Sequence, residues 1–173
     1  MAAPNSLPQP SLDQREAHNP SNINIKRPRV VLVDDHPVIL RRVLSLISAE
    51  FDVVDVLDDG RPLPGMVHRI NPDLIVLDIT LPGLNGIEIA ALLKKTGTSA
   101  KIVFFTIHAD PDYAREAFRT GAMGYVIKPR LASDLIPALK AAMSNQRFVS
   151  PCPELAELAN GLKGLKQAED NSI

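Results

Sequence analysis

Acidic residues directly follow two apolar runs of this chain. Asp34 and Asp35 come after Val30–Val33, and Asp78 comes after Leu74–Leu77. If these runs are neighbouring strands of a parallel sheet, the carboxylates meet at the edge where the strands end. Two carboxylates about 5 Å apart repel each other by roughly 3 kcal/mol at an effective dielectric constant near 20. Either one carboxyl group holds a proton or a cation binds, and Mg²⁺ suits an oxygen-lined site that also handles phosphate.

Two further polar residues follow apolar runs in the same way. Thr106 comes after Ile102–Phe105, and Lys128 comes after Tyr125–Ile127. An aspartate beside Mg²⁺ can act as a nucleophile toward phosphorus, and an ammonium and a hydroxyl can stabilise the charge of the transferred group. The set is therefore complete for phosphoryl transfer to an aspartate.

Other motifs that carry chemistry are missing from the sequence. There is no Walker loop, no GxGxxG turn and no Ser-His-Asp arrangement. Nucleotide hydrolysis, dinucleotide binding and acyl transfer lose support accordingly.

Short apolar runs alternate with helical patterns from residue 30 to residue 146, and this alternation must position the polar residues. The expected strands are Val30–Val33, Val53–Leu57, Leu74–Leu77, Ile102–Phe105 and Tyr125–Ile127. The expected helices are Pro37–Ala49, Leu63–Ile70, Ile87–Lys95, Pro111–Arg119 and Ser133–Ser144, the second short or irregular because it contains Pro64 and Gly65. Continuously apolar strands are typical of a parallel sheet covered on both faces. We expect an α/β fold, a three-layer α/β/α sandwich with a flavodoxin-like five-stranded sheet of order 2-1-3-4-5.

Residues that cap helices support two of these elements. Asp110 and Pro111 suit the N-cap and first position of one helix, which Gly121 closes. Ser133 is the expected cap of the last helix, with Pro137 tolerated near the first turn.

Composition and length limit the remaining choices. The 173 residues suit one domain with two tails, and 19 Lys and Arg against 20 Asp and Glu give no general attraction to nucleic acid or anionic membranes. The single cysteine, Cys152, has no internal disulfide partner, which suits a reducing cytoplasm. Neither a signal peptide nor a membrane-spanning run is present, so we expect a soluble, cytoplasmic protein.

The two ends of the chain differ from its middle. Residues 1–26 are rich in Pro, Ser, Asn and Gln and are expected to form a disordered leader, with the main domain at 27–147. Residues 148–173 are expected to form a connector and an amphipathic tail. Leu155, Leu158, Leu162 and Leu165 share one helical face there, but Gly161 and Gly164 weaken the helix, so it is expected to form only against a partner surface.

The motifs "VLVDDHP", "VLDITLPGLNG", "FFT" and "GYVIKP" resemble, in order and spacing, the receiver domain of bacterial response regulators. The resemblance covers about residues 29–146. It implies that Asp78 is the phosphoacceptor, that Asp34 and Asp35 hold Mg²⁺ with Asp78 and the main-chain carbonyl of Thr80, and that Lys128 contacts the phosphate. It also implies that Thr106 and Tyr125 form a switch pair and that a cis peptide bond precedes Pro129.

The "DDHP" start and the "RFVSP" end are similar to the NarL/FixJ subfamily, in which a DNA-binding helix-turn-helix normally follows. Only residues 152–173 follow Pro151 here, too few for that domain. For its partners, the resemblance implies a histidine kinase or histidine phosphotransfer protein as the phosphodonor and a homodimer on phosphorylation. It implies no enzyme beyond slow self-dephosphorylation, and we expect no direct nucleic-acid binding by this chain.

Two alternatives to this interpretation stay open from the sequence. A haloacid-dehalogenase-type phosphatase also uses a strand-end aspartate with Mg²⁺ and lysine, but normally has a second aspartate where this chain has Thr80. A phosphorylation-independent dimerisation module on the same fold is the other. Among the histidines, His36 is expected to begin a helix rather than bind metal, and His108 either borders the site or lies on the surface.

Overall fold

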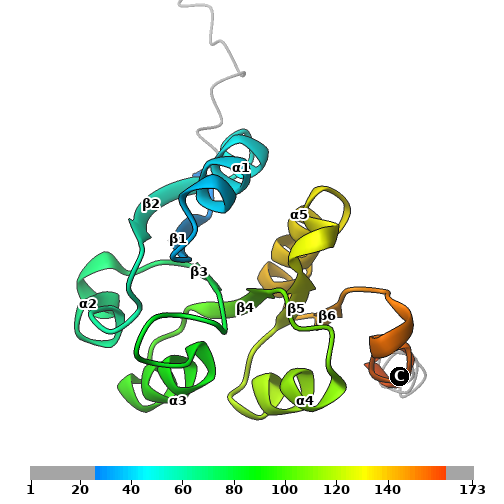
Figure 1. The fold of residues 1–173 in the computed structure, drawn as a ribbon. Helices are drawn as coiled ribbons and strands as arrows, with labels where there is room; N and C mark the ends of the chain where they lie inside the picture. Colours follow the sequence, from blue (N-terminus) through cyan, green and yellow to red (C-terminus); the bar gives the residue numbers. More distant parts are fainter. Residues whose placement is uncertain (1–25, 163–173) are drawn as a thin grey trace, which may run out of the picture.

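The computed structural model describes residues 26–162. Six parallel strands form one sheet in the order β2-β1-β3-β4-β5-β6 (Figure 1). The strands are β1 Arg29–Val33, β2 Asp52–Leu57, β3 Leu74–Leu77, β4 Lys101–Thr106, β5 Gly124–Ile127 and β6 Phe148–Val149. The predicted order of the first five strands is confirmed.

Helices cover both faces of the sheet and complete the predicted three-layer α/β/α sandwich (Figure 1). The α-helices are α1 Pro37–Ile47, α2 Leu63–Ile70, α3 Gly86–Thr96, α4 Pro111–Arg119 and α5 Leu131–Met143, and the 3₁₀ turns are η1 Lys128–Arg130 and η2 Pro153–Leu155. One core cluster packs α1 and α5 against the sheet, and the other packs α2, α3 and α4 against its opposite face. None of the described helices has the length and apolar character needed to cross a bilayer.

The apolar runs form the predicted strands because both sheet faces need covering. Every residue of β3 and β5 is buried, as are four of the five residues of β1. The edge strand β2 is more exposed: it begins at Asp52, and Asp55 interrupts its apolar residues. Polar groups on an edge strand discourage pairing with other chains.

Local capping fixes the helix that follows β3. The Asn85 side chain accepts a hydrogen bond from the Ile87 N–H, and the Asn85 N–H donates to Glu88, which makes a capping box. Gly86 begins α3 directly against the Asp78 backbone, where an added Cβ would collide with the carbonyl of Asp78. The start of α3 therefore holds the end of β3 in place.

Three expectations about the second half of the chain were wrong. The sheet has a sixth strand, because Phe148 N–H and Ser150 N–H donate to Met123 O and Tyr125 O, each at 2.9 Å, and align β6 with β5. Arg130 rather than Ser133 is the N-cap of α5, so Pro137 lies inside this helix. The Ser133 hydroxyl instead donates to Asp134 at 2.6 Å.

The peptide bond before Pro129 is trans, as are all peptide bonds among residues 26–162, so the expected cis bond was wrong. Pro129 is the second residue of the 3₁₀ turn η1, a position where the fixed φ of proline fits the start of a helix. An X–Pro bond also favours trans by about 0.5–1 kcal/mol in the absence of other constraints.

The C-terminal leucines pack on the domain itself. Leu155 is fully buried, and Leu158 and Leu162 are half-buried against the same core cluster as α2, α3 and α4. The expectation that this helix needs a partner surface was therefore wrong for residues 156–162, which are helical on the chain's own surface. Leu165 and nearly all of the predicted leader lie outside the described residues.

Candidate functional site

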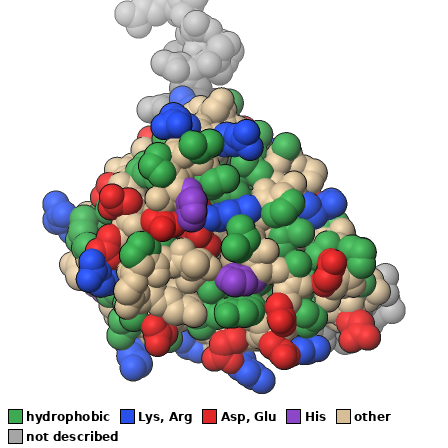
Figure 2. All heavy atoms as spheres, viewed as in Figure 1, with side chains coloured by type: hydrophobic (Ala, Val, Ile, Leu, Met, Phe, Trp, Pro, Cys, Tyr) green, Lys and Arg blue, Asp and Glu red, His purple; other side chains and the backbone are tan. Residues whose placement is uncertain are grey.

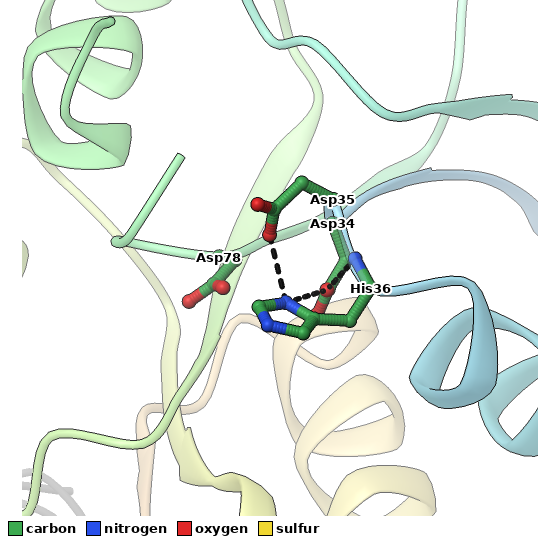
Figure 3. A group of neighbouring side chains, drawn as sticks. All are labelled: Asp34, Asp35, His36 and Asp78. Atoms are coloured by element: carbon green, nitrogen blue, oxygen red, sulfur yellow. Dashed lines mark hydrogen bonds and ion pairs between the residues drawn. The ribbon is translucent and has the colours of Figure 1, made fainter. Parts of the chain in front are cut away.

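Four neighbouring side chains lie where β1 and β3 end: Asp34, Asp35, His36 and Asp78 (Figure 3). Each offers a ligand atom, and these atoms lie within 4.8 Å of one another. Register explains the arrangement, since Val33 of β1 pairs with Leu77 of β3, and Asp34 and Asp78 are the next residues. Strand pairing therefore brings together carboxylates that are 44 positions apart in the sequence.

Lys128 reaches this cluster from the end of β5. Its Nζ lies 2.7 Å from Asp34 Oδ2 and 2.7 Å from Asp78 Oδ2. The Lys128 and Asp34 side chains are only 7% and 5% exposed, so the ammonium is shielded from solvent and bridges two buried carboxylates. The sequence prediction that Lys128 lies against Asp78 is met by this geometry.

Burial controls the ionisation of this pair. Burial raises the pKa of Asp78, although the hydrogen bond and charge of Lys128 pull the pKa down. Burial lowers the pKa of Lys128, but hydrogen bonds to Asp34 and Asp78 outweigh this and raise the pKa overall. The single ammonium faces several carboxylates, so the cluster holds excess negative charge in a shielded place.

Two buried carboxylate oxygens of the cluster are held by ion pairs alone. Asp34 Oδ2 lies 2.7 Å from Lys128 Nζ, and Asp35 Oδ1 lies 2.7 Å from His36 Nδ1. Three carboxylates thus share one ammonium and one imidazole. Carboxylate oxygens are the ligands that a hard divalent cation prefers, so the residues present fit Mg²⁺.

His36 is the N-cap of α1, as expected, and its Nδ1 also lies 3.3 Å from Asp34 Oδ1. The ring thus contacts both residues of the acidic pair, as the dashed lines in Figure 3 show. Its backbone N–H also donates to Asp34 Oδ1 at 2.9 Å and fixes that carboxylate. That His36 is not itself a metal ligand stays a prediction.

Thr106 and Tyr125 are both fully buried and meet at His108. The His108 N–H donates to Thr106 Oγ1 at 3.3 Å, and the Tyr125 hydroxyl donates to the His108 carbonyl at 2.9 Å. Burial raises the pKa of Tyr125 well above its usual range. Among residues 26–162, no hydrogen bond joins Thr106 to Asp78, so Thr106 and Tyr125 are linked to each other through His108 and not directly to the carboxylates.

His108 also closes the side of the site, which decides between the two interpretations left open for it. Its Nε2 lies 2.8 Å from Thr80 Oγ1, and its ring stacks on Tyr113 at 4.4 Å between centroids. The Thr80 N–H donates to Asp78 Oδ1 at 3.2 Å. His108 therefore links the loop after β3 with α4 and is not a free surface residue. The role of the Thr80 carbonyl as a metal ligand stays a prediction.

Side chains of these types gather on one face of the molecule. Figure 2, viewed as Figure 1, shows acidic side chains beside histidine and basic ones near the middle of the face. Apolar side chains lie around them, and Val38 of α1 and Ile107, directly after β4, are exposed hydrophobic residues.

Some residues that matter for the site were missed by sequence reasoning. Gly86 supports the Asp78 backbone, and its signal was the "LNG" start of a helix directly after the acidic strand. Near η1 the buried Ser150 and Asp134 form a second polar cluster with the partly exposed Arg130, and no sequence pattern indicated that they would meet.

The sheet order and the acidic edge with its lysine define the flavodoxin-like class of signalling domains. The sequence profile of the response regulator receiver domain matches residues 30–140. The chain therefore belongs to the response regulator receiver family, a part of two-component signalling, and the resemblance seen in the sequence is confirmed.

Similar proteins of this family include a transcriptional regulatory protein and a nitrate/nitrite response regulator. The chain is 32% identical over 132 residues to the transcriptional regulatory protein DegU of Brevibacillus brevis, covering 75% of this chain and 56% of DegU. It is 33% identical over 148 residues to the nitrate/nitrite response regulator NarL of Escherichia coli, covering 83% of this chain and 68% of NarL. The chain thus spans between about half and two thirds of these relatives.

Solved structures show the same fold. A LuxR-family two-component response regulator from Aurantimonas is 33% identical with a TM-score of 0.70, and the match covers 76% of this chain and 94% of that one. The receiver domain of a NarL regulator from Mycobacterium tuberculosis is 26% identical with a TM-score of 0.60, covering 68% and 97%. These relatives agree with the NarL-like interpretation of the sequence.

Proposed function

We propose that Asp78 accepts a phosphoryl group from a histidine kinase or a histidine phosphotransfer protein and that the domain changes conformation in response. The single observation that carries this proposal is the contact of Lys128 Nζ with Asp34 and Asp78, 2.7 Å each, in a buried acidic cluster. In the transfer, an Asp78 carboxylate oxygen forms a bond to phosphorus while the bond from phosphorus to the donor imidazole nitrogen breaks. The bonding electron pair stays with that nitrogen.

The chain's own residues supply position and charge for this step. The Thr80 N–H donates a hydrogen bond to Asp78 Oδ1. Lys128 is placed to contact the added phosphoryl group, because its Nζ already contacts Asp78 Oδ2. Asp34, Asp35, Asp78 and the main-chain carbonyl of Thr80 would hold Mg²⁺. When bound, this ion neutralises phosphoryl oxygens and orients the donor group.

The conformational response would run through Thr106, Tyr125 and His108. A phosphoryl group adds a charge near −2 with three acceptor oxygens, and the Thr106 hydroxyl at the end of β4 can donate to it. That movement would withdraw Thr106 Oγ1 from the His108 N–H. The Tyr125 hydroxyl, which donates to the His108 carbonyl, would lose its fixed partner, so the surface of α4 would change.

Partners, location and output belong to the same proposal. A homodimer forms on phosphorylation, the chain itself contacts neither nucleic acid nor membrane, and the setting is the cytoplasm. The relative DegU is named a transcriptional regulatory protein and is longer than this chain, so we propose that the chain serves in the control of transcription. Receiver domains are phosphoacceptors, and we propose no enzymatic activity here beyond slow loss of the phosphoryl group.

Incubation with Mg²⁺ and acetyl phosphate tests the assignment, with intact mass as the readout and Asp78→Asn as the paired variant. We expect one phosphoryl group on the wild type and none on Asp78→Asn. Asp58→Asn, an exposed carboxylate after β2, is the control and should label like the wild type. Equal labelling of Asp78→Asn would reject Asp78 as the acceptor.

The two alternatives from the sequence give different results in the same experiment. A phosphorylation-independent module would bind Mg²⁺ without labelling, even with a purified kinase. A phosphatase would hydrolyse a chromogenic phosphate ester, but the family match and Thr80 in place of a second aspartate do not favour that activity.

A further inference from the structure

The chain continues past β6 and returns to the domain. We call residues 148–162 the C-terminal segment. It begins with β6, passes through η2, which contacts α4, and ends in the helical residues 156–162 (Figure 1). Leu155 is fully buried against the core cluster of α2, α3 and α4, and Leu158 and Leu162 pack on the same cluster. The segment is thus seated on the layer that contains α4.

Ser150 fastens this segment to β5. Its N–H donates to the Tyr125 carbonyl at 2.9 Å, and its hydroxyl oxygen accepts from the Ile127 N–H at 3.1 Å. The Ser150 side chain is fully buried and also hydrogen-bonds Asp134. One hydroxyl therefore connects the C-terminal segment to the end of β5 and to α5.

Asp134 extends this connection toward the phosphorylation site. It is 3% exposed, and Arg130 donates to it through Nε at 2.6 Å and through Nη2 at 3.2 Å. Arg130 and Lys128 are the two ends of η1, a single 3₁₀ turn of three residues. Lys128, at the other end, bridges Asp34 and Asp78. The buried acidic cluster and a second, partly buried polar cluster are therefore joined by one short turn.

Resting on the proposed function, we infer that phosphorylation of Asp78 loosens the C-terminal segment through Lys128, η1 and the cluster of Arg130, Asp134 and Ser150. In the described arrangement Lys128 contacts two carboxylates, and a phosphoryl group redirects the ammonium to new oxygens. Because Lys128 and Arg130 share one turn, movement of Lys128 shifts Arg130 and the partners of Ser150. Linkage makes the coupling reciprocal, so a firmly seated segment opposes phosphorylation.

Cys152 can report whether the C-terminal segment is packed on the domain. It is the chain's single cysteine, half-buried against the same core cluster and two residues beyond Ser150. Its alkylation by N-ethylmaleimide at fixed pH depends on local opening of the segment. Intact mass reads the phosphoryl group and the alkyl group on the same molecule, so phosphorylated and unphosphorylated molecules can be compared in one tube containing Mg²⁺ and acetyl phosphate.

We expect phosphorylated molecules of the full chain to be alkylated about fivefold faster or more than unphosphorylated ones, the lower end of typical coupling. Asp78→Asn should show no response of Cys152 to acetyl phosphate. Equal or slower alkylation of phosphorylated molecules would overturn the inference and leave the proposed function intact. Absence of the phosphoryl group, even with a purified kinase, would reject the proposed function itself and the inference with it.

Ser150→Ala tests the link without phosphorylation. Cys152 should be alkylated faster than in the wild type before any phosphodonor is added, and phosphorylation should then add less than twofold. Ser45→Ala, an exposed serine on α1, is the matched control and should behave like the wild type. If Ser150→Ala fails to fold, Asp134→Asn weakens the same cluster with its shape kept. A wild-type alkylation rate in the folded variant would overturn the role of the cluster.

Discussion

Two aspartates of this domain, Asp78 and Asp134, are almost equally buried, at 2% and 3% exposure, but have opposite surroundings. Burial raises the pKa of Asp134, but hydrogen bonds from Arg130, Ser133 and Ser150 outweigh it and lower the pKa overall. At Asp78 burial also raises the pKa, and Lys128 offsets this only in part. The pKa of one buried carboxyl group is therefore lowered, and that of the other stays raised.

This difference separates a carboxylate with a structural role from the proposed phosphoacceptor. Asp134 has its hydrogen-bonding capacity filled, so its charge is stabilised in the fold. Asp78 shares one ammonium with Asp34, and a third carboxylate, Asp35, lies beside them, so the site retains the capacity to bind a cation or a phosphoryl group. Such incomplete satisfaction costs stability, and it is typical of functional sites.

The largest expected effect on stability comes from a substitution that disturbs the backbone of Asp78. In Gly86→Ala the new methyl group would collide with the carbonyl oxygen of Asp78, and backbone atoms of β3 cannot move aside without disturbing the sheet. We expect the free energy of unfolding to fall by more than about 3 kcal/mol, measured by urea denaturation followed by circular dichroism.

Gly65→Ala is the control for this substitution. Gly65 lies inside α2 with no atom within 4 Å of an added Cβ, so alanine should raise the free energy of unfolding by about 0.5–1 kcal/mol. A stability of Gly86→Ala within about 1 kcal/mol of the wild type would show that the start of α3 does not hold Asp78.

The second effect concerns the satisfied carboxylate. Asp134→Ala leaves Ser150 without its acceptor and removes both contacts to Arg130, so we expect a loss of about 1–3 kcal/mol in urea unfolding. Glu116→Ala removes an exposed ion pair with Arg119 and should change stability by less than about 1 kcal/mol. Equal losses in the two variants would contradict the structural role given to Asp134.

The same two aspartates mark what the sequence could predict. Asp78 was predictable because it follows an apolar run, and parallel pairing of neighbouring strands brings run ends together, as Val33 and Leu77 show. The bounds of β3, α2 and α4 were also predicted without error, because periodicity and capping act over a few neighbouring residues.

Asp134 and Ser150 were not predictable, because their contact depends on packing of the chain after α5. Two residues of β6 carry too little periodicity to be distinguished from a connector, and the buried position of Leu155 depends on a surface formed by α4. The start of α5 moved to Leu131 because Ser133 bonds Asp134 instead of capping the helix. Such long-range contacts have no local signal in one sequence.

A smaller effect tests the binding capacity of the site. Mg²⁺ at about ten times its dissociation constant should raise the free energy of unfolding by about 1.4 kcal/mol, because a ligand of the folded state stabilises it by mass action. Thermal unfolding with and without Mg²⁺ measures this change. In Asp35→Asn, which loses one carboxylate of the cluster, the shift should be much smaller. An equal shift in both proteins would place the bound ion elsewhere.

The smallest expected effect is the pH dependence of Asp78→Asn. The pKa of the Asp78 carboxyl is raised in the folded state, so the folded state binds this proton more tightly than the unfolded chain does. The ionised carboxylate therefore costs stability above its folded pKa, and the cost disappears as the pH falls through that pKa toward the unfolded value near 3.8.

Without Mg²⁺, Asp78→Asn should be more stable than the wild type at pH 7, by less than Asp134→Ala loses, and the two proteins should converge on acidification. Urea midpoints across the acid range measure this, with Asp58→Asn as an exposed control of constant, small difference. A variant less stable than the wild type at pH 7 would mean that Lys128 compensates the Asp78 charge in full, and Asp78 would then resemble Asp134.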